Sequence, residues 1–338
     1  MSIPFSEDNL LIGAAGNIKY VFDNKEDCQK MVWSFPKAVM EKADGITISQ
    51  AVVEEKEAED AIQQLENRLR AQRNKAITIR DTAGLMVTET TRRTGGVGFE
   101  YYKNEVIDFG QKQKLEASNS ANKRLAKDIF ESKQFHAAEF PFDISEMIKG
   151  DKNQSWIAVI HADGNNLGKK LIKMGEVLNG DEARKAFKEF SKKLDKATKK
   201  SAKEAFEKVI EPVLKDKKLN RIPFRPVLLG GDDLTAIIRG DLALDYTQVF
   251  LGEFESSTKE EFKDFDTKYG LKNELFSKGL TACAGIAYIK ANYPFHYGAS
   301  LAESLCQKAK DASKKINQEH SPSSLMFHKV HASFIEDF

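Results

Sequence analysis

One short stretch constrains the fold of this 338-residue chain more than any other. Two apolar runs, Pro226–Leu229 and Leu234–Ile238, stand on either side of the tetrapeptide Gly230–Asp233. Apolar runs of this length are typical of buried strands, and paired glycines between them are typical of a tight hairpin turn. The sequence therefore predicts a β-hairpin whose turn carries two adjacent carboxylates, Asp232 and Asp233.

The two carboxylates of this turn admit two interpretations. Neighbouring side chains of a regular strand point to opposite faces, but in a turn both can reach the same end of a sheet. Crowded carboxylates repel one another unless a cation lies between them, and hard ions such as Mg²⁺ take oxygen ligands and substrate phosphates. Alternatively, Gly and Asp are simply common turn residues and the acids are solvated. The tetrapeptide alone does not decide between a cation site and an ordinary turn.

A second acidic motif occurs earlier in the chain, directly after another apolar run. The run Trp156–Ala162 predicts a buried strand that ends at Asp163, and Gly164, Asn165 and Asn166 follow it. Glycine lets the backbone approach a phosphate or a metal closely. The two asparagine side chains can form hydrogen bonds with a base or a ribose.

The order of the predicted elements in the second half is β-α-β-β-α-β, which is the ferredoxin-like arrangement of an α+β fold. The elements are the strand at 156–162, a helix at 181–215 broken near Pro212, the hairpin, a helix at 242–269 and a strand at 280–289, with an extra helix at 299–316 and a last strand at 325–327. In this fold the first strand is central and lies beside a strand of the hairpin. Asp163, Asp232 and Asp233 should therefore meet at one edge of the sheet, where three carboxylates suit a two-metal site for in-line phosphoryl transfer.

These motifs resemble those of a known family. The segments that carry the resemblance are Ala162–Gly168, Gly230–Asp233, Ala284–Tyr288 and Ala309–Lys314. They are similar to the palm domain of the large subunit of type III CRISPR effectors, and more distantly to GGDEF nucleotide cyclases and polymerase palms. The resemblance covers residues 155–316. It implies an enzyme that joins ATP, or another NTP, into a cyclic di- or oligonucleotide second messenger with release of pyrophosphate, in antiviral defence.

The resemblance also assigns roles to individual residues. Asp163 and Asp232 would be metal ligands, and Asp233 would assist, as a ligand or near the attacking 3′-hydroxyl. Lys310 would face the triphosphate, with Lys314 as a second candidate; without the resemblance both lysines would be interpreted as solvated helix residues. The implied cofactor is Mg²⁺ or Mn²⁺ in a two-metal site. The other expected nucleotide-binding residues are Gly164, Asn165, Asn166, Gly168, Gly230 and Gly231.

The sequence departs from the family pattern in two respects. The large subunits often carry an HD nuclease domain, but none of the six histidines here is followed by an aspartate. They also often carry a four-cysteine zinc element, whereas this chain has three cysteines, Cys28, Cys283 and Cys306, and no CxxC pair. A stand-alone or minimal relative is therefore expected, and neither a zinc ribbon nor a disulfide framework is predicted.

The first half of the chain contains a weak repeat of the hairpin. Ala14–Phe22 can be aligned with Gly230–Ile238, and a helix, a strand and a helix are predicted after it, at 27–43, 45–53 and 54–74. Gly16 and Asn17 then stand where the metal carboxylates would be. The repeat predicts a degenerate palm that holds no metal, supports the site and binds the second nucleotide. The alternative is a coincidence between two small-residue turns.

The expected domain organisation follows from this repeat. A degenerate palm-like domain is predicted at residues 1–150 and a catalytic palm at 151–338, with the polar segment Lys149–Gln154 as the linker. The length of the chain agrees with two domains.

Composition argues against several classes of protein. The net charge of +1, with 41% hydrophobic and 30% charged residues, is ordinary for a globular protein and gives no strong signal for nucleic-acid or membrane-surface binding. No run of about 18 apolar residues predicts a membrane span. The N-terminus lacks the basic and apolar regions of a signal peptide, so a cytoplasmic protein is expected.

The leading hypothesis is therefore a nucleotidyltransferase. No general base is obvious, and His161, on an apolar strand, is interpreted as a packed residue. The main alternative is a non-catalytic nucleotide-binding or RNA-effector scaffold subunit, which the three retained acids argue against. A template-directed polymerase is disfavoured because no thumb or basic groove is predicted. The expected partners are the NTP substrate and either a second copy of the chain or a subunit of an effector complex.

Overall fold

The structure is a computed structural model that describes residues 5–14, 17–54, 58–75, 87–129, 140–141, 143–148, 156–178, 180–217, 221–272 and 274–331. Two compact units make up the chain: Met1–Leu10 with Tyr20–Ala121, and Leu11–Lys19 with Asn122–Phe338. Within the described residues, no helix has both the length and the apolar character needed to cross a membrane. The predicted linker at 149–154 lies outside the described residues, so the domain boundary near residue 150 stays a prediction.

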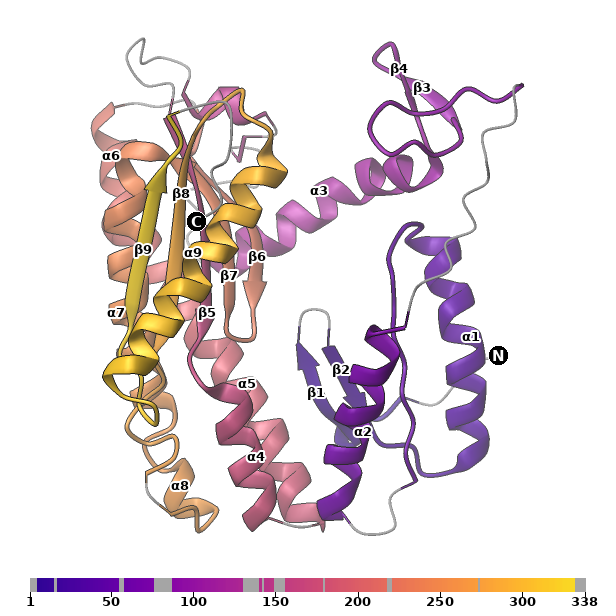
Figure 1. Cartoon of the computed structure of the whole chain (residues 1–338), viewed down its shortest axis with the longest axis vertical. Helices are drawn as coiled ribbons and strands as arrows, with labels where there is room; N and C mark the ends of the chain where they lie inside the picture. Colours follow the sequence, from indigo (N-terminus) through magenta and orange to yellow (C-terminus); the bar gives the residue numbers. More distant parts are fainter. Residues whose placement is uncertain are drawn as a thin grey trace. The chain divides into compact units, whose positions relative to one another are not determined.

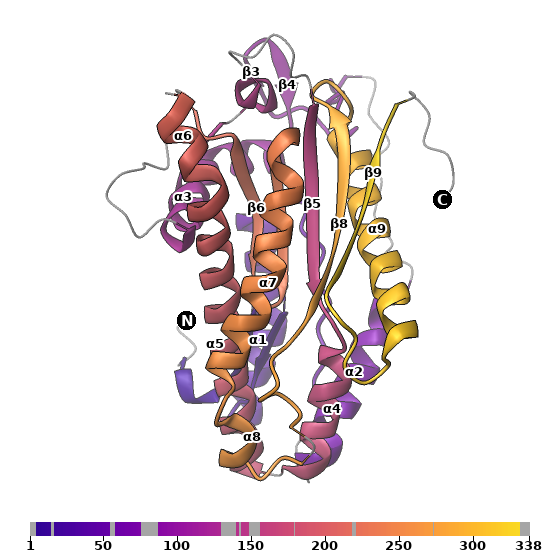
Figure 2. The same cartoon turned by 90° about the vertical axis from the view of Figure 1, so that its left-hand side faces the viewer.

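A five-stranded mixed sheet forms the centre of the second unit (Figures 1 and 2). Its order is β6-β7-β5-β8-β9, in which β6, β7, β5 and β8 are antiparallel to their neighbours and β9 runs parallel to β8. The strands are β5 (Trp156–Gly164), β6 (Phe224–Gly230), β7 (Asp233–Arg239), β8 (Ala282–Lys290) and β9 (Ser324–Lys329). The predicted α+β ferredoxin-like palm is thus confirmed, with β5 central beside the hairpin of β6 and β7 and with β9 as the added strand.

The central strands are apolar because helices cover both faces of the sheet. Residues 157–160 on β5 are fully buried, which explains why this strand is a continuous apolar run rather than an alternating one. Helix α9 (Phe295–Ile316) packs on one face, and α5 (Gly180–Ala205) and α7 (Ala243–Glu261) lie on the other (Figure 2).

Helix α9 lies unusually close to β8 at Gly285. A Cβ atom added to Gly285 would stand 2.8 Å from Leu305 Cβ and would overlap the backbone of Ala302 and Cys306. Leu301, Ala302 and Leu305 of α9 are buried against the same sheet face in one apolar cluster. The absence of a side chain at Gly285 therefore sets the position of α9, and with it the position of every residue that α9 presents to the site.

Aromatic side chains dominate the opposite face. Phe224 of β6 lies between Phe206 and Tyr246, with ring centroids 5.9 and 4.9 Å away, and all three are fully buried. Burial of each such ring stabilises the fold by about 1.5–3 kcal/mol. The short helix α8 (Phe265–Lys268) adds the ring of Phe265 to this core, with its centroid 6.4 Å from that of Phe190.

The predicted helix at 181–215 is broken, as expected from Pro212. Helix α5 ends at Ala205, a π turn follows at Phe206–Ile210, and α6 (Glu211–Lys217) begins one residue before the proline. Proline has no N–H, and in a continuous α-helix its ring would clash with the carbonyl of residue 208. The wider π turn removes that clash. The remaining helix of the second unit, α4 (Leu167–Val177), begins just after the second acidic motif.

The other described elements are short strands and helices. A 3₁₀ turn at Glu7–Asn9 precedes the paired strands β1 (Leu10–Ala14) and β2 (Asn17–Tyr20), and the helices α1 (Lys25–Lys42) and α2 (Ala58–Arg73) follow. A second strand pair, β3 (Glu100–Tyr102) and β4 (Glu105–Ile107), precedes α3 (Phe109–Ile129). Gly16 lies outside the described residues, so the degenerate palm stays a prediction.

The strand predicted at 45–53 is wrong. These residues are described and belong to no strand. Their backbone groups bond instead to side chains of α2: Gln50 N donates to Gln72 Oε1 at 3.1 Å, and Val52 O accepts from Arg68. Polar side chains can satisfy backbone groups without a neighbouring strand, and the alternating apolar pattern does not distinguish the two cases.

Candidate active site

Three carboxylates converge at one end of the central strands. Asp163 lies near the end of β5, Asp232 in the turn between β6 and β7, and Asp233 at the first position of β7. The register that pairs Ala162 with Leu234 brings these residues together, and one carboxylate oxygen from each lies within 4.8 Å of the others. The predicted meeting of the two acidic motifs is therefore found in the structure.

The triad is electrostatically strained. Burial, together with the charges of Asp233 and Asp163, raises the pKa of Asp232 to about 7. Burial and the charge of Asp163 also raise the pKa of Asp233, although His161 and Lys310 oppose this rise. Partly buried carboxylates with raised pKa values fit a site for a hard divalent cation, because a cation would relieve their repulsion and accept their oxygens as ligands.

Gly164 and the turn glycines allow the triad to form. A Cβ atom on Gly164 would stand 2.6 Å from Leu167 Cδ1 and 3.0 Å from both Cβ and Oδ2 of Asp232. Gly231 has a φ of 63°, a backbone conformation that favours glycine. Gly230 adjoins it with a φ of 159°. Gly164 and Gly231 thus have backbone roles at the site, and the predicted contact of all three glycines with a nucleotide stays a prediction.

The turn is also anchored from α5. The hydroxyl of Thr198, which is fully buried, donates to Gly231 O at 2.6 Å and lies 3.0 Å from Leu194 O in its own helix. Thr198 thereby fixes the turn that carries Asp232. Sequence reasoning missed this residue, because a threonine on a long helix has no local pattern that signals a distant backbone partner.

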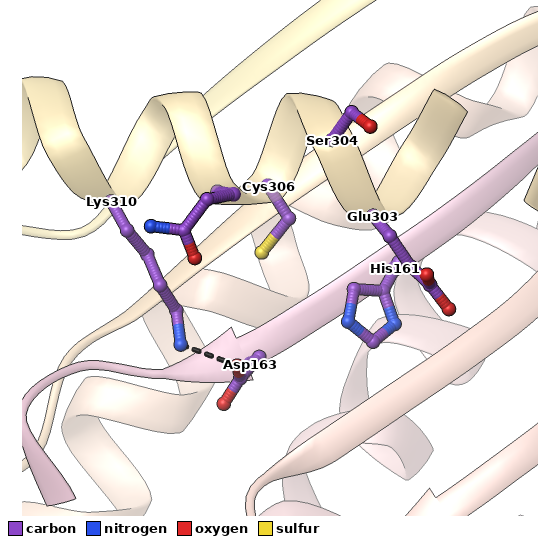
Figure 3. Close-up of a pocket in the computed structure, with 7 residues that line it drawn as sticks. His161, Asp163, Glu303, Ser304, Cys306 and Lys310 are labelled. Carbon is purple, nitrogen blue, oxygen red and sulfur yellow. Dashed lines mark ion pairs between the residues drawn. The ribbon is translucent and has the colours of Figure 1, made fainter. Parts of the chain in front are cut away.

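Lys310 reaches the triad from α9 (Figure 3). Its ammonium group forms an ion pair with Asp163 and donates a hydrogen bond to Gly164 O at 2.9 Å. The predicted position of Lys310 at the site is thus found. Lys314, one turn further along α9, lies 3.9 Å from Asp311 and does not line the cavity described below.

The two asparagines of the second motif hold a neighbouring loop. The side-chain amide of Asn165 is buried and donates to Thr281 Oγ1 at 3.1 Å, and its backbone N–H donates to Thr281 O. The amide of Asn166 donates to Gln318 O at 3.2 Å and to Ser321 Oγ at 3.0 Å. Their predicted bonds to a base or ribose stay predictions, since both amide nitrogens already have protein partners.

Gly168 differs from the other glycines of the predicted set. A Cβ atom there would meet nothing within 4 Å, so the first turn of α4 is open at this position. Close approach of a nucleotide to Gly168 is geometrically allowed and stays a prediction.

A cavity of about 380 Å³ opens beside the triad, between β5 and α9 (Figure 3). His161 and Asp163 of β5 form part of its wall, so His161 is half-buried beside the site, and its interpretation as a packed residue stays a prediction. Alternation places both side chains on the same face of the strand, and His161 Nδ1 lies 3.0 Å from Thr235 Oγ1 of β7. The other lining residues are Glu303, Ser304, Cys306, Gln307 and Lys310.

Sequence reasoning missed the α9 side of this cavity. Glu303, Gln307 and Lys310 follow one another at helical spacings of four and three, which places them on one face of the helix. Once Lys310 is chosen as a site residue, this spacing in the sequence is enough to predict that Glu303 and Gln307 lie on the same face of the helix. Burial raises the pKa of the Cys306 thiol to about 12, so the lining thiol is uncharged at neutral pH.

Comparisons with known proteins agree with this geometry. A sequence model of the family described as Cas10/Cmr2, second palm domain, matches residues 156–318. No curated protein sequence matches the chain.

Similar folds occur among solved structures. The Csm1–Csm4 cassette in complex with cA4 matches with a TM-score of 0.51 and 13% identity over 92% of this chain and 46% of that chain. The cassette in complex with AMPPNP matches with a TM-score of 0.50 and 12% identity over 90% of this chain and 46% of that chain. The chain thus spans less than half of the length of these structures, and at this identity they show the fold alone. Together with the family match and the carboxylate triad, they identify residues 156–318 as a Cas10-like palm domain.

Proposed function

We propose that the protein is a metal-dependent nucleotidyltransferase that joins ATP, or another NTP, into a cyclic di- or oligonucleotide. The observation that carries this proposal is the triad Asp163, Asp232 and Asp233, whose oxygens lie within 4.8 Å of one another on a Cas10-like palm. The structures of similar fold were solved with cA4, with pppApA and with AMPPNP, which supports nucleotide polymerisation as the chemistry of the fold.

The reaction proposed for the site forms one phosphodiester bond at a time. The 3′-oxygen of one nucleotide bonds to the α-phosphorus of the next, the bond from that phosphorus to the bridging oxygen breaks, pyrophosphate leaves, and the hydroxyl proton passes to solvent. A last transfer within the product closes the ring. Divalent ions, when bound, would lower the pKa of the attacking hydroxyl and neutralise charge on the phosphates.

The residues of the chain have distinct proposed roles in this reaction. Asp163, Asp232 and Asp233 would hold Mg²⁺ or Mn²⁺ through carboxylate oxygens. Lys310, which balances Asp163 in the structure, would turn its ammonium group to the triphosphate as metal neutralises the triad. Gly164 would leave room beside Asp232 for the reacting groups, because any side chain at this position would overlap Asp232.

The partners and biological role are part of the same proposal. Two nucleotides need two binding surfaces, which the proposed degenerate palm at residues 1–150, a second copy of the chain or a subunit of an effector complex would supply. The Csm1 structures of similar fold are cassettes with Csm4, which supports an effector-complex partner. A role in antiviral signalling would follow from a cyclic product.

The test is incubation of the purified protein with each of the four NTPs and Mg²⁺ or Mn²⁺. Pyrophosphate release and mass spectrometry of the products report the reaction. Asp232→Ala and Asp233→Ala should abolish both signals, whereas Asp181→Ala, at an 85% exposed carboxylate on α5, should leave them unchanged. Nucleotide binding without pyrophosphate release, with every nucleotide and metal, would instead indicate the non-catalytic scaffold.

A further inference from the structure

The edge of the central sheet at β9 has unpaired backbone groups. β9 is the last strand of the sheet and runs parallel to β8 (Figures 1 and 2). Val330 N donates to Tyr288 O at 2.9 Å, and the backbone groups of successive residues point alternately to the two sides of a strand. The N–H and C=O groups of Leu325, Phe327 and Lys329 therefore point away from β8. In the part of the chain that the structure describes, these groups have no hydrogen-bond partner.

β9 lacks the features that keep most edge strands from pairing with another chain. Exposed edges usually carry a central charge, a proline or a bulge. β9 contains no proline, its register with β8 has no shift, and Lys329 at its end is its sole Lys, Arg, Asp or Glu residue. Phe327, near the middle of the strand, is 61% exposed. This edge is therefore open to a further strand.

Apolar surface continues from this edge onto the face of the sheet opposite α9. The ring centroid of Phe327 lies 6.3 Å from that of Tyr288, and both side chains line a cavity of about 400 Å³ together with Trp156 and Leu244, which is 41% exposed. Met326 points to the other face and packs against the apolar cluster beneath α9. Exposed apolar surface beside an open strand edge is typical of a protein–protein interface.

We propose that β9 pairs in antiparallel fashion with β9 of a second copy of the chain, about a two-fold axis at Phe327. In such a pair, outward-facing residues exchange both hydrogen bonds with outward-facing residues opposite them. Only one register pairs all three: Phe327 lies opposite Phe327 of the partner subunit, and Leu325 lies opposite Lys329 of the partner subunit. Every outward N–H and C=O group of β9 is then bonded. Two-fold dimers are also the commonest soluble oligomers.

The side chains and helices around β9 are compatible with a second copy as the occupant. Ring meets ring at the axis, and the aliphatic stem of Lys329 meets Leu325. The Lys329 residues of the two copies stand roughly 14 Å apart along the strands, at about 3.4 Å per residue, so like charges do not face each other. Helix α9 packs mainly on β8, roughly 7 Å from the axis at about 4.8 Å per strand. The two α9 helices therefore stay farther apart than the about 8–10 Å of packed helices and do not clash.

Analytical ultracentrifugation of the full chain, without nucleotide or metal, measures this pairing. The average mass should rise from 38.0 kDa toward twice this value between roughly 1 and 200 µM. Phe327→Lys and Phe327→Glu should each weaken the dimer at least about tenfold, because two like charges then face each other at the axis. An equimolar mixture of these two variants should restore it. Trp33→Lys, at an exposed ring on α1, should associate as the wild type does.

Introduced cysteines test the register. Residues paired in this way have Cα atoms about 5.5 Å apart, within the range of a disulfide. With glutathione disulfide as oxidant, Phe327→Cys should form a covalent dimer by itself, whereas Leu325→Cys should form one only when mixed with Lys329→Cys. The wild type, in which Cys283 and Cys306 are buried, is the control. A mass of 38.0 kDa at every concentration, no recovery in the Lys and Glu mixture, or equal crosslinking of Leu325→Cys alone would overturn the proposal.

Discussion

At the scale of single residues, Asp232 links the candidate site to the stability of the protein. Its pKa in the folded chain, about 7, lies above the value of about 3.9 for an unfolded aspartate. The folded state therefore binds more protons than the unfolded state between these two values. The stabilisation is fully present below about pH 3.9 and is lost as the pH rises through 7, at about 1.4 kcal/mol for each unit of pKa difference.

We therefore predict that the metal-free protein melts at a lower temperature at pH 8 than at pH 5. Asp232→Asn should flatten this dependence, because an amide carries no charge to repel Asp163 and Asp233. Millimolar Mg²⁺ should raise the melting temperature of the wild type at pH 8 and have less effect on the variant. Thermal unfolding in EDTA and in Mg²⁺ measures both effects. Asp181→Asn, at an exposed carboxylate, is the control and should keep the pH dependence of the wild type. If Asp232→Asn also kept it, repulsion among the three carboxylates would not be its cause.

Two glycines four residues apart give a second prediction. Gly164→Ala should abolish pyrophosphate release, because the added methyl would stand 2.6 Å from Leu167 Cδ1 and 3.0 Å from the Asp232 carboxylate. Gly168→Ala meets nothing within 4 Å and should leave the fold intact, with a gain of up to about 1 kcal/mol from helix propensity. Circular dichroism checks folding, and a coupled pyrophosphate assay checks activity. Equal activity of the two variants would show that close approach at Gly164 is not required.

At the scale of elements, helix α5 positions the hairpin turn through one hydroxyl. Thr198→Val keeps the shape of the side chain but removes the donor to Gly231 O, a half-buried carbonyl, and loss of one such hydrogen bond costs about 1 kcal/mol. We predict a loss of stability of this size in urea, and a fall in kcat larger than the change in KM, because Thr198 supports the turn and does not touch the nucleotide. Thr198→Ser should restore most of the activity.

Ser201 supplies the matched control for this element. Its hydroxyl is also buried on α5, but it donates to Ala197 O within its own helix, at 2.7 Å. Ser201→Ala should therefore cost less stability and leave kcat unchanged. If Thr198→Val and Ser201→Ala lowered the free energy of unfolding and kcat equally, the hydrogen bond from Thr198 to Gly231 O would not be what positions the turn.

The elements that the sequence predicts well are those with a local signature. The strand before Asp163 and the hairpin at Gly230–Asp233 are visible because apolar runs end at small and acidic residues. The prediction of a strand at 45–53 is wrong because the apolar alternation does not reveal that the side chains of Gln72 and Arg68 form hydrogen bonds with backbone groups of this segment. Distant packing is equally hidden from the sequence. The close approach of α9 at Gly285, which carries Lys310 to Asp163, depends on a glycine that looks ordinary in an apolar strand.

At the scale of the whole molecule, the two compact units differ in their cores. In the second unit, eight of the largest fully buried side chains are aromatic: seven lie between Phe206 and Phe265, and the eighth is Phe276. Helix α1, in the other unit, has no buried residue over its 18 positions, and Trp33 on it is 79% exposed. Apolar burial supplies most of the stability of a domain, so the two units should unfold at different denaturant concentrations.

We predict two transitions in urea, the first of which removes helical signal without a change at Trp156. The Trp33→Phe variant makes Trp156 the only indole, so its fluorescence reports the second unit while circular dichroism at 222 nm reports both. Mg²⁺ should move only the later transition, since Asp163, Asp232 and Asp233 all belong to the second unit. If the fluorescence and the circular dichroism changed at the same urea concentration, and Mg²⁺ raised that concentration for both, the chain would instead unfold as a single cooperative unit. The first half of the chain would then be stabilised through the palm.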